Sequence, residues 1–203
     1  MTEGITMKIL LCGCGALGSQ IALHLARPEI EFVLVDDERV EETNIATSAY
    51  GQQHIGMLKV CALASMLWQK CRCKADDYNV TLCRDVMPSI HEACRDHNAA
   101  LIIDTFDNAE ARAIACKLYD DYYSFRIVHA GVSQDRTGEI LWNKDYVLPT
   151  VRVPRGENPI CTHELGAPIL RFTAALCANI VEDWIETGNE RSVVITQKWE
   201  VLG

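Results

Sequence analysis

The chain has 203 residues, of which 49% are hydrophobic and 23% charged, so it can bury a sizeable core and is not a disordered chain. Its net charge of −9 argues against a protein that binds a nucleic-acid backbone, because such proteins need a basic face. We therefore expect one domain over residues 1–203 and no nucleic acid among its partners.

The N-terminus and the cysteines bear on the cellular compartment. Met1–Lys8 has neither the basic start nor the apolar run of a secretory signal, and no apolar segment approaches membrane-spanning length. The chain contains 10 cysteines but no Cys-x-x-Cys pair, which argues against a structural zinc site. We expect a cytoplasmic protein with reduced thiols and no membrane contact.

Strand-like and helix-like segments alternate along the first half of the chain. Short apolar runs predict strands at Met7–Cys12, Glu31–Val35 and Asp77–Cys83. Helical spacing of apolar residues predicts helices at Ala16–Ala26, Met57–Lys70 and Ser89–His97. Val40–Gln53 has no regular period and predicts a loop or short turns.

The alternation continues in the second half. The predicted strands are Leu101–Asp104, Arg126–Ala130, Glu139–Trp142 and Ser192–Val201, and the predicted helices are Ala109–Tyr123 and Pro168–Thr187. Gly188 is expected to cap the last helix, whose apolar stripe includes Phe172 and Trp184 and suits a core or an interface. Tyr146–Glu164 contains three prolines and predicts a surface loop.

This alternation predicts an α/β fold. We expect a Rossmann-like, doubly wound and mostly parallel sheet with helices on both faces, and mixed strands toward the C-terminus. In such sheets ligands bind at the carboxyl ends of the strands, near the point where the strand order reverses.

A glycine-rich turn, Gly13-Cys14-Gly15-Ala16-Leu17-Gly18, follows the first predicted strand and opens the first helix. Its glycines allow a tight turn, close approach of a phosphate, and close packing of helix on strand. Asp36 ends the second predicted strand, where a carboxylate typically binds ribose hydroxyls. These features predict a nucleotide site, and up to this point NAD and ATP fit equally well.

Three further motifs separate these nucleotides. Asp36-Asp37-Glu38-Arg39-Val40 leads to Asn44, Ile55-Gly56 precedes Lys59, and Asp104-Thr105-Phe106-Asp107-Asn108 precedes Arg112. Several motifs in this order resemble the ThiF/MoeB/HesA family, whose adenylating domain is shared with ubiquitin-activating enzymes. The resemblance covers about residues 7–142 well and the C-terminal third loosely.

The resemblance implies an activity and a set of roles. The family uses Mg-ATP to adenylate the C-terminal glycine of a small ubiquitin-like or sulfur-carrier protein, forming an acyl-adenylate and pyrophosphate, and its members are usually homodimers. By resemblance Asp36 would hold the ribose, Asn44 and Lys59 would contact phosphate, and Asp107, beside Asn108, would hold magnesium. The phosphates would lie on the turn, against Gly13, Gly15, Ala16, Leu17 and Gly18.

Physical chemistry supports two of these roles independently. Lys59 is predicted in the first turn of a helix, where the helix dipole disfavours a cation unless an anion such as triphosphate lies nearby. Asp107 follows a predicted strand, and a carboxylate beside phosphates suits Mg²⁺. The plainer alternatives are a solvated surface lysine and an N-cap aspartate, and Asp104 is expected to cap the end of its strand.

Cys161 is a second candidate for chemistry. It lies in the predicted loop, where family members often carry a cysteine, used in some of them for thioester or acyl-disulfide chemistry. His163, two residues on, is expected to lower the pKa of the thiol. The alternative is an unreactive loop cysteine.

Thr47 departs from the family pattern. It stands where the family has an arginine that stabilises charge during phosphoryl transfer, and Ser48 stands where glutamine is usual. A partner subunit or another arginine could supply the charge: Arg112, Arg126, Arg152, Arg155 or Arg171. The departure keeps open a non-catalytic scaffold that binds nucleotide or carrier. An NAD-dependent oxidoreductase is the further alternative, but it leaves Asn44, Lys59 and Asp107 unexplained.

Overall fold

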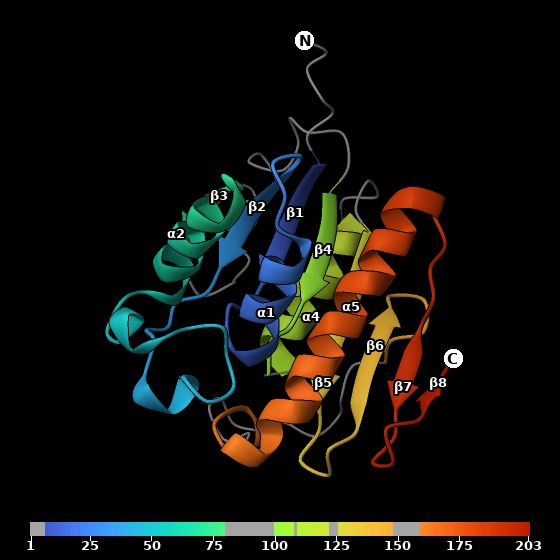
Figure 1. The fold of residues 1–203 in the computed structure, drawn as a ribbon. Helices are drawn as coiled ribbons and strands as arrows, with labels where there is room; N and C mark the ends of the chain where they lie inside the picture. The colour runs from blue at the N-terminus through green and yellow to red at the C-terminus, as the bar shows by residue number, and fades with distance from the viewer. Residues whose placement is uncertain (1–6, 80–99, 108, 122–125, 148–158) are drawn as a thin grey trace.

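The computed structural model describes residues 7–79, 100–107, 109–121, 126–147 and 159–203. In this part of the chain the strands form one sheet in the order β3-β2-β1-β4-β5-β6-β7-β8 (Figure 1). The strands are β1 Met7–Cys12, β2 Ile30–Val35, β3 Lys74–Tyr78, β4 Ala100–Asp104, β5 Arg126–Val132, β6 Gly138–Trp142, β7 Val193–Ile195 and β8 Val201–Leu202. The longer helices are α1 Ala16–Leu25, α2 Lys59–Cys71, α4 Ala109–Asp121 and α5 Ala167–Thr187.

The sheet combines a parallel and an antiparallel part. Strands β3, β2, β1, β4 and β5 pair in parallel. Strands β6, β7 and β8 extend the sheet in antiparallel pairing. This arrangement confirms the predicted doubly wound sheet with mixed strands near the C-terminus. The strand order reverses between β1 and β4, so a ligand crevice is expected at their carboxyl ends.

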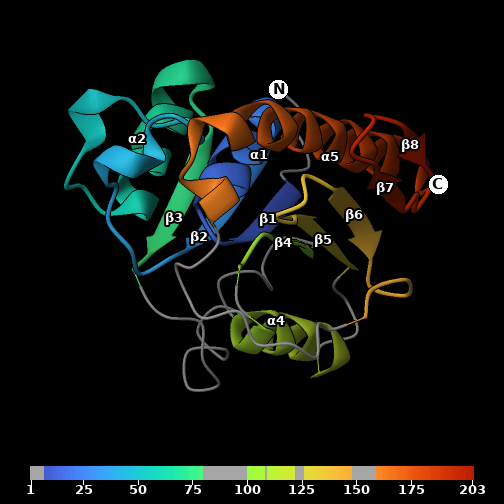
Figure 2. The same cartoon turned by 90° about the horizontal axis from the view of Figure 1, so that it is seen from below.

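Helices cover both faces of the sheet. Figure 2 shows α1, α2 and α5 on one face and α4 on the other. The central strands are therefore buried on both sides, which explains why they are continuous apolar runs rather than alternating ones. In β1, every residue from Ile9 to Cys12 is fully buried.

Helix α5 is the longest helix, and it packs on α1 (Figure 1). It begins with Pro168 near its start and ends at Gly188, whose φ of 76° confirms the predicted glycine cap. Trp184 packs on Trp142 of β6, so this end of the stripe belongs to the core. Phe172 instead contacts Trp199 edge-on, and both side chains are exposed.

One segment contradicts the expectation that no apolar run approaches membrane-spanning length. Glu164–Thr187 is long and apolar enough to cross a membrane by length and composition alone. Its mean hydropathy is 1.3, and 56% of its most apolar window is buried inside the fold, as in the core helix of a globular domain.

Three predicted elements differ in more than the exact end of a helix or strand. Helix α2 begins at Lys59 rather than Met57, because Leu58 is still extended. The strand predicted from Asp77 begins earlier, as β3, because the exposed charged residues of this edge strand hide its period, and residues 80–83 of the prediction lie outside the described residues. The predicted strand Ser192–Val201 is two short strands, β7 and β8, joined by a turn in which Trp199 has a φ of 66°. The predicted helix Ser89–His97 lies outside the described residues.

Candidate functional site

The glycine-rich turn is held at the carboxyl end of β1. Gly13 has a φ of 93°, which favours glycine, and its amide donates to the Val35 carbonyl of β2 at 2.9 Å. A Cβ at Gly18 would lie 2.0 Å from the Gly13 carbonyl oxygen, so only glycine allows α1 to pack this closely on the turn. Thr105, which follows β4, donates its hydroxyl to the same carbonyl at 2.9 Å.

The N-terminus of α1 is built to accept an anion. Gly15 precedes the helix without a side-chain cap, and the first turn, which starts with Ala16 and Leu17, carries no acidic residue. A Cβ at Gly15 would meet nothing within 4 Å, so the backbone is open at this position. The first amides of a helix have no partner within it, and they attract anions such as phosphate.

Asp36 lies beside this turn, at the end of β2. One carboxylate oxygen accepts the Cys14 amide at 2.7 Å and the other accepts the Glu38 amide at 2.8 Å. Burial raises the pKa of Asp36, and the ammonium of Lys59 and the two amides partly oppose that rise. An ionised carboxylate has about four acceptor positions, so its oxygens can still accept ribose hydroxyls.

Lys59 is the first residue of α2 and is only 5% exposed. Its ammonium lies 2.5 Å from Glu38 Oε2. Burial by itself lowers the pKa of Lys59, but the carboxylates of Asp36 and Glu38 outweigh burial and raise it. The side chain is therefore a buried cation among acidic groups rather than a solvated surface lysine.

Tyr50, for which no sequence motif predicts a role, connects the glycine-rich turn with Lys59. Its buried hydroxyl lies 2.6 Å from the Cys14 carbonyl oxygen and 3.2 Å from that of Lys59. It therefore ties the glycine-rich turn to the start of α2. No short motif could identify this contact, because it joins residues 36 positions apart.

Asn44 organises the loop that contains Thr47. The Asn44 side-chain oxygen accepts the Glu41 amide at 2.9 Å, which leaves its NH₂ group as a donor toward a ligand. The loop lies against α1, where Gln20 donates to the Thr47 carbonyl at 2.6 Å. Thr47 is fully buried, and its hydroxyl donates to the carbonyl of Cys161.

The two aspartates at the carboxyl end of β4 have different environments. Asp104 is fully buried, with one oxygen 2.8 Å from His129 Nδ1 and the other accepting the Phe106 amide at 3.1 Å. Asp107 is exposed, and within the described residues no hydrogen bond or ion pair engages its carboxylate. No cluster of three or more metal-ligating side chains occurs in the described part of the chain, and Asn108 lies outside it. A metal here would need oxygen ligands from a substrate.

Cys161 belongs to this site, but its thiol differs from expectation. Burial raises its pKa to about 11, and Asp107 adds to the rise while Lys59 and Arg112 oppose it. The expectation that His163 lowers this pKa is wrong, because His163 Nδ1 instead accepts the Leu165 amide at 3.2 Å. The influence of Asp107, Lys59 and Arg112 on one thiol shows that the fold brings these charges together.

The described residues fit a nucleoside triphosphate at the carboxyl ends of the parallel strands. The open helix N-terminus suits phosphate, Asp36 suits a ribose, and Lys59 supplies a cation beside both. Asp107 suits Mg²⁺, which typically binds one or two carboxylates together with substrate phosphates and water.

Comparisons with solved structures place this fold among known ones. The chain resembles Escherichia coli MccB bound to AMPCPP and MccA with a TM-score of 0.74 and 17% identity, over 98% of this chain and 63% of MccB. It resembles PaaA with a TM-score of 0.71 and 15% identity, over 98% of this chain and 64% of PaaA. The chain thus spans less than two thirds of the length of either protein.

Sequence comparison gives a direct assignment. No curated protein matches the chain significantly. The ThiF family model, however, matches residues 5–181, which is most of the sequence. The motifs, the doubly wound sheet and this match agree, and the chain belongs to the ThiF family.

Proposed function

We propose that this chain is an ATP-dependent adenylyltransferase. It would activate the C-terminal glycine carboxylate of a small ubiquitin-like or sulfur-carrier protein and form an acyl-adenylate and pyrophosphate. The observation that carries the proposal is Lys59, a buried cation that begins α2 beside Asp36 and the glycine-rich turn. A buried ammonium needs strong anionic partners, and a triphosphate on the turn would be one.

The chemistry requires positioning rather than a protein nucleophile. A carboxylate oxygen of the substrate attacks the α-phosphorus of ATP and forms a new O–P bond. The bond from that phosphorus to the β-phosphate oxygen breaks, and its electron pair leaves with pyrophosphate. The residues of the site hold the reacting groups in line and stabilise negative charge on the phosphates. Mg²⁺, when bound through Asp107, would neutralise part of that charge.

The substrate class rests on resemblance. E. coli MccB has been solved with ATP, and the microcin C7 biosynthetic enzyme MccB has been solved with N-formylated MccA. An N-formyl group blocks an amino terminus and leaves a carboxyl end available, so a peptide with a free C-terminus is a second class of substrate to test. The proposal of homodimerisation and of a cytoplasmic location rests on the family and the free cysteines alone.

A non-catalytic scaffold is the second candidate function. The buried hydroxyl of Thr47 cannot replace a guanidinium, and it is already engaged with the Cys161 carbonyl. Without the positive charge of the family's arginine at position 47, the site would bind nucleotide but would not transfer an adenylyl group.

Calorimetry with ATP plus magnesium, and separately with NAD⁺ and NADH, tests the proposal first. Lys59→Ala is expected to weaken ATP binding by about tenfold to hundredfold, because a hydrogen bond to a charged group contributes about 1.5–3 kcal/mol. Asp107→Ala is expected to remove the dependence of that binding on magnesium.

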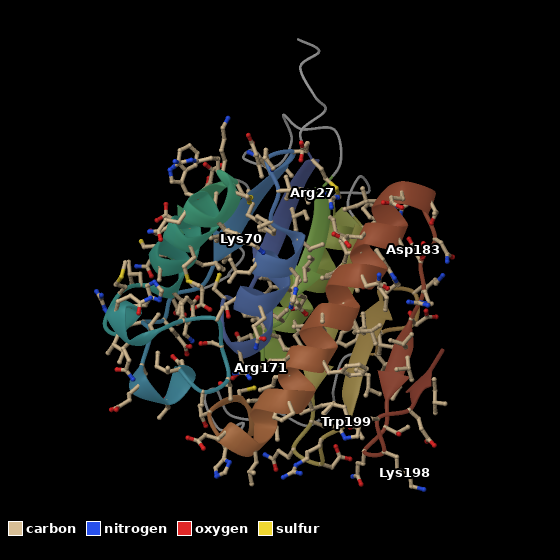
Figure 3. The ribbon with its side chains drawn as sticks, in the orientation of Figure 1. Arg27, Lys70, Arg171, Asp183, Lys198 and Trp199 are labelled. Atoms are coloured by element: carbon tan, nitrogen blue, oxygen red, sulfur yellow. The ribbon has the colours of Figure 1, made fainter. Side chains whose placement is uncertain are left out.

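Matched controls come from charges far from the glycine-rich turn. Figure 3 shows Lys198 at the turn between β7 and β8 and Asp183 near the far end of α5. Lys198→Ala and Asp183→Ala are expected to bind ATP as the unmodified chain does. Binding of NAD⁺ or NADH in place of ATP would overturn the proposal and favour an oxidoreductase.

A further inference from the structure

Arg112 is a buried arginine that contacts the residue preceding Asp107. It lies on α4, is 8% exposed, and donates through Nε to the Phe106 carbonyl at 2.5 Å. Phe106 lies between Thr105, which bonds to the glycine-rich turn, and Asp107. Arg112 is thus attached to the short segment that runs from the glycine-rich turn to the predicted magnesium ligand.

The Tyr146 hydroxyl, on a ring that stacks on His129, holds the Arg112 guanidinium through a second hydrogen bond. Arg112 Nη1 donates to the Tyr146 hydroxyl at 3.0 Å. The Tyr146 ring stacks on His129, with centroids 3.6 Å apart and planes inclined by 14°. His129 is itself fully buried and lies 2.8 Å from Asp104. Tyr146 is therefore held in place with its hydroxyl toward Arg112, and the guanidinium is preorganised.

Acidic groups around Arg112 keep its guanidinium charged: burial lowers the pKa of Arg112, but Asp104, Tyr146 and Glu139 outweigh burial and raise it. Tyr146 is a neutral partner at neutral pH, since phenol ionises near pH 10 and burial raises the pKa of Tyr146 further. The ion pair between Arg112 and Glu139 is 3.7 Å long and involves a carboxylate that is 40% exposed. The charge of Arg112 lowers the pKa of the Cys161 thiol, as does that of Lys59, so both cations lie within electrostatic range of Cys161.

The other described arginines that could replace the family's cation lie elsewhere. Arg126 begins β5, at the amino edge of the sheet, and pairs with Glu190 at 3.2 Å. Arg171 is exposed on α5 and donates to the Ala46 carbonyl at 3.3 Å, next to Thr47 (Figure 3). Arg152 and Arg155 lie outside the described residues. Arg171 is therefore the competitor that an experiment must separate from Arg112.

We propose that Arg112, positioned by Tyr146 and His129, contacts the triphosphate and supplies the positive charge that position 47 lacks. This inference rests on the proposed adenylation. In that reaction the guanidinium would stabilise the phosphate oxygens while the new O–P bond forms and pyrophosphate departs with the electron pair of the broken bond. Tyr146 and His129 are positioning residues, because they act only through Arg112.

The test compares ATP with AMP as calorimetric probes, each with magnesium. Arg112→Ala is expected to weaken ATP binding about tenfold or more and to leave AMP binding within about twofold, because AMP lacks the β- and γ-phosphates. Arg112→Lys is expected to restore part of the loss. Tyr146→Phe keeps the stacked ring but removes the hydroxyl, and it is expected to reduce the ATP-to-AMP affinity ratio less than Arg112→Ala does.

The ATP-to-AMP ratio separates a phosphate contact from a structural role. If Arg112 were only structural, its variants would weaken both nucleotides together and lower the unfolding temperature, and the inference would be wrong. A selective loss of ATP in Arg171→Ala, with Arg112→Ala unaffected, would assign the role to Arg171 instead. Arg126→Ala is the matched control and is expected to match the unmodified chain.

Failure of this inference is distinguishable from failure of the proposed function. If the unmodified chain binds NAD⁺ and not ATP, the adenylating function itself is wrong. If the unmodified chain binds ATP and Arg112→Ala keeps the full ATP-to-AMP ratio, only the role of Arg112 is wrong.

Discussion

At the scale of single residues, the environment of Cys161 decides how reactive it is. Because burial raises its pKa to about 11, the thiolate fraction at neutral pH is about 300-fold smaller than for an ordinary cysteine of pKa about 8.5. We expect iodoacetamide to label Cys161 slowly at pH 7, and more rapidly as the pH rises toward 11. Mass spectrometry that resolves each labelled cysteine measures this rate.

The same cysteine in the urea-unfolded chain is the control for that rate. Unfolding removes burial, so the labelling rate at pH 7 should rise to that of an ordinary thiol. Rapid labelling of Cys161 in the folded chain at pH 7 would instead show that its thiol is activated.

At the scale of elements, the crossing of β1 and α1 depends on Gly18. A Cβ there would lie 2.0 Å from the Gly13 carbonyl oxygen, and neither backbone segment can yield without moving the helix. We expect Gly18→Ala to destabilise the fold by about 1–3 kcal/mol, as overpacking does. Equilibrium unfolding in urea measures the free energy difference.

Gly15 offers a matched comparison in the same turn. A Cβ at Gly15 meets nothing within 4 Å, although the ψ of −143° at Gly15 lies outside the regions usual for L-residues. We expect Gly15→Ala to strain the backbone without a steric clash, and therefore to destabilise the fold less than Gly18→Ala does. Equal destabilisation by both substitutions would contradict the close-packing role of Gly18.

At the scale of the whole molecule, we expect the centre of the sheet to be better protected from hydrogen exchange than its edge. Strand β1 pairs with β2 and β4 and is fully buried from Ile9 to Cys12. Strand β8 is an edge strand whose Val201 and Leu202 are 44% and 58% exposed. Hydrogen exchange read by mass spectrometry is expected to be slowest in β1 and β4 and fastest in β8.

The unfolded chain in denaturant supplies the intrinsic exchange rates for that comparison. If β8 exchanged as slowly as β1, the edge of the sheet would be covered in solution. That outcome would point to a partner on Phe172 and Trp199, which contact each other edge-on and are 37% and 50% exposed.

Much of the fold was predictable because its signals are local. Apolar runs and helical spacing identified β1, β2, β4, α1, α4 and α5, and Gly188 marked the end of α5. The misses have local causes as well. Strand β3 carries Lys74, Asp76 and Asp77, which an edge strand tolerates but which hide its period. The turn that divides the last predicted strand contains no glycine or proline to mark it.

The sequence by itself determined the glycine-rich turn, the acidic end of β2 and the order of the family motifs, since each is a run of neighbouring residues. Only the tertiary structure decided which side chains meet there. Tyr146, His129 and Asp104 come together around Arg112 across separations of 34 residues for Tyr146 and Arg112 and 25 for His129 and Asp104. Likewise, the burial that raises the pKa of Cys161 comes from packing of distant segments. Contacts of this kind depend on the register and crossing of whole elements, which no local pattern of residues encodes.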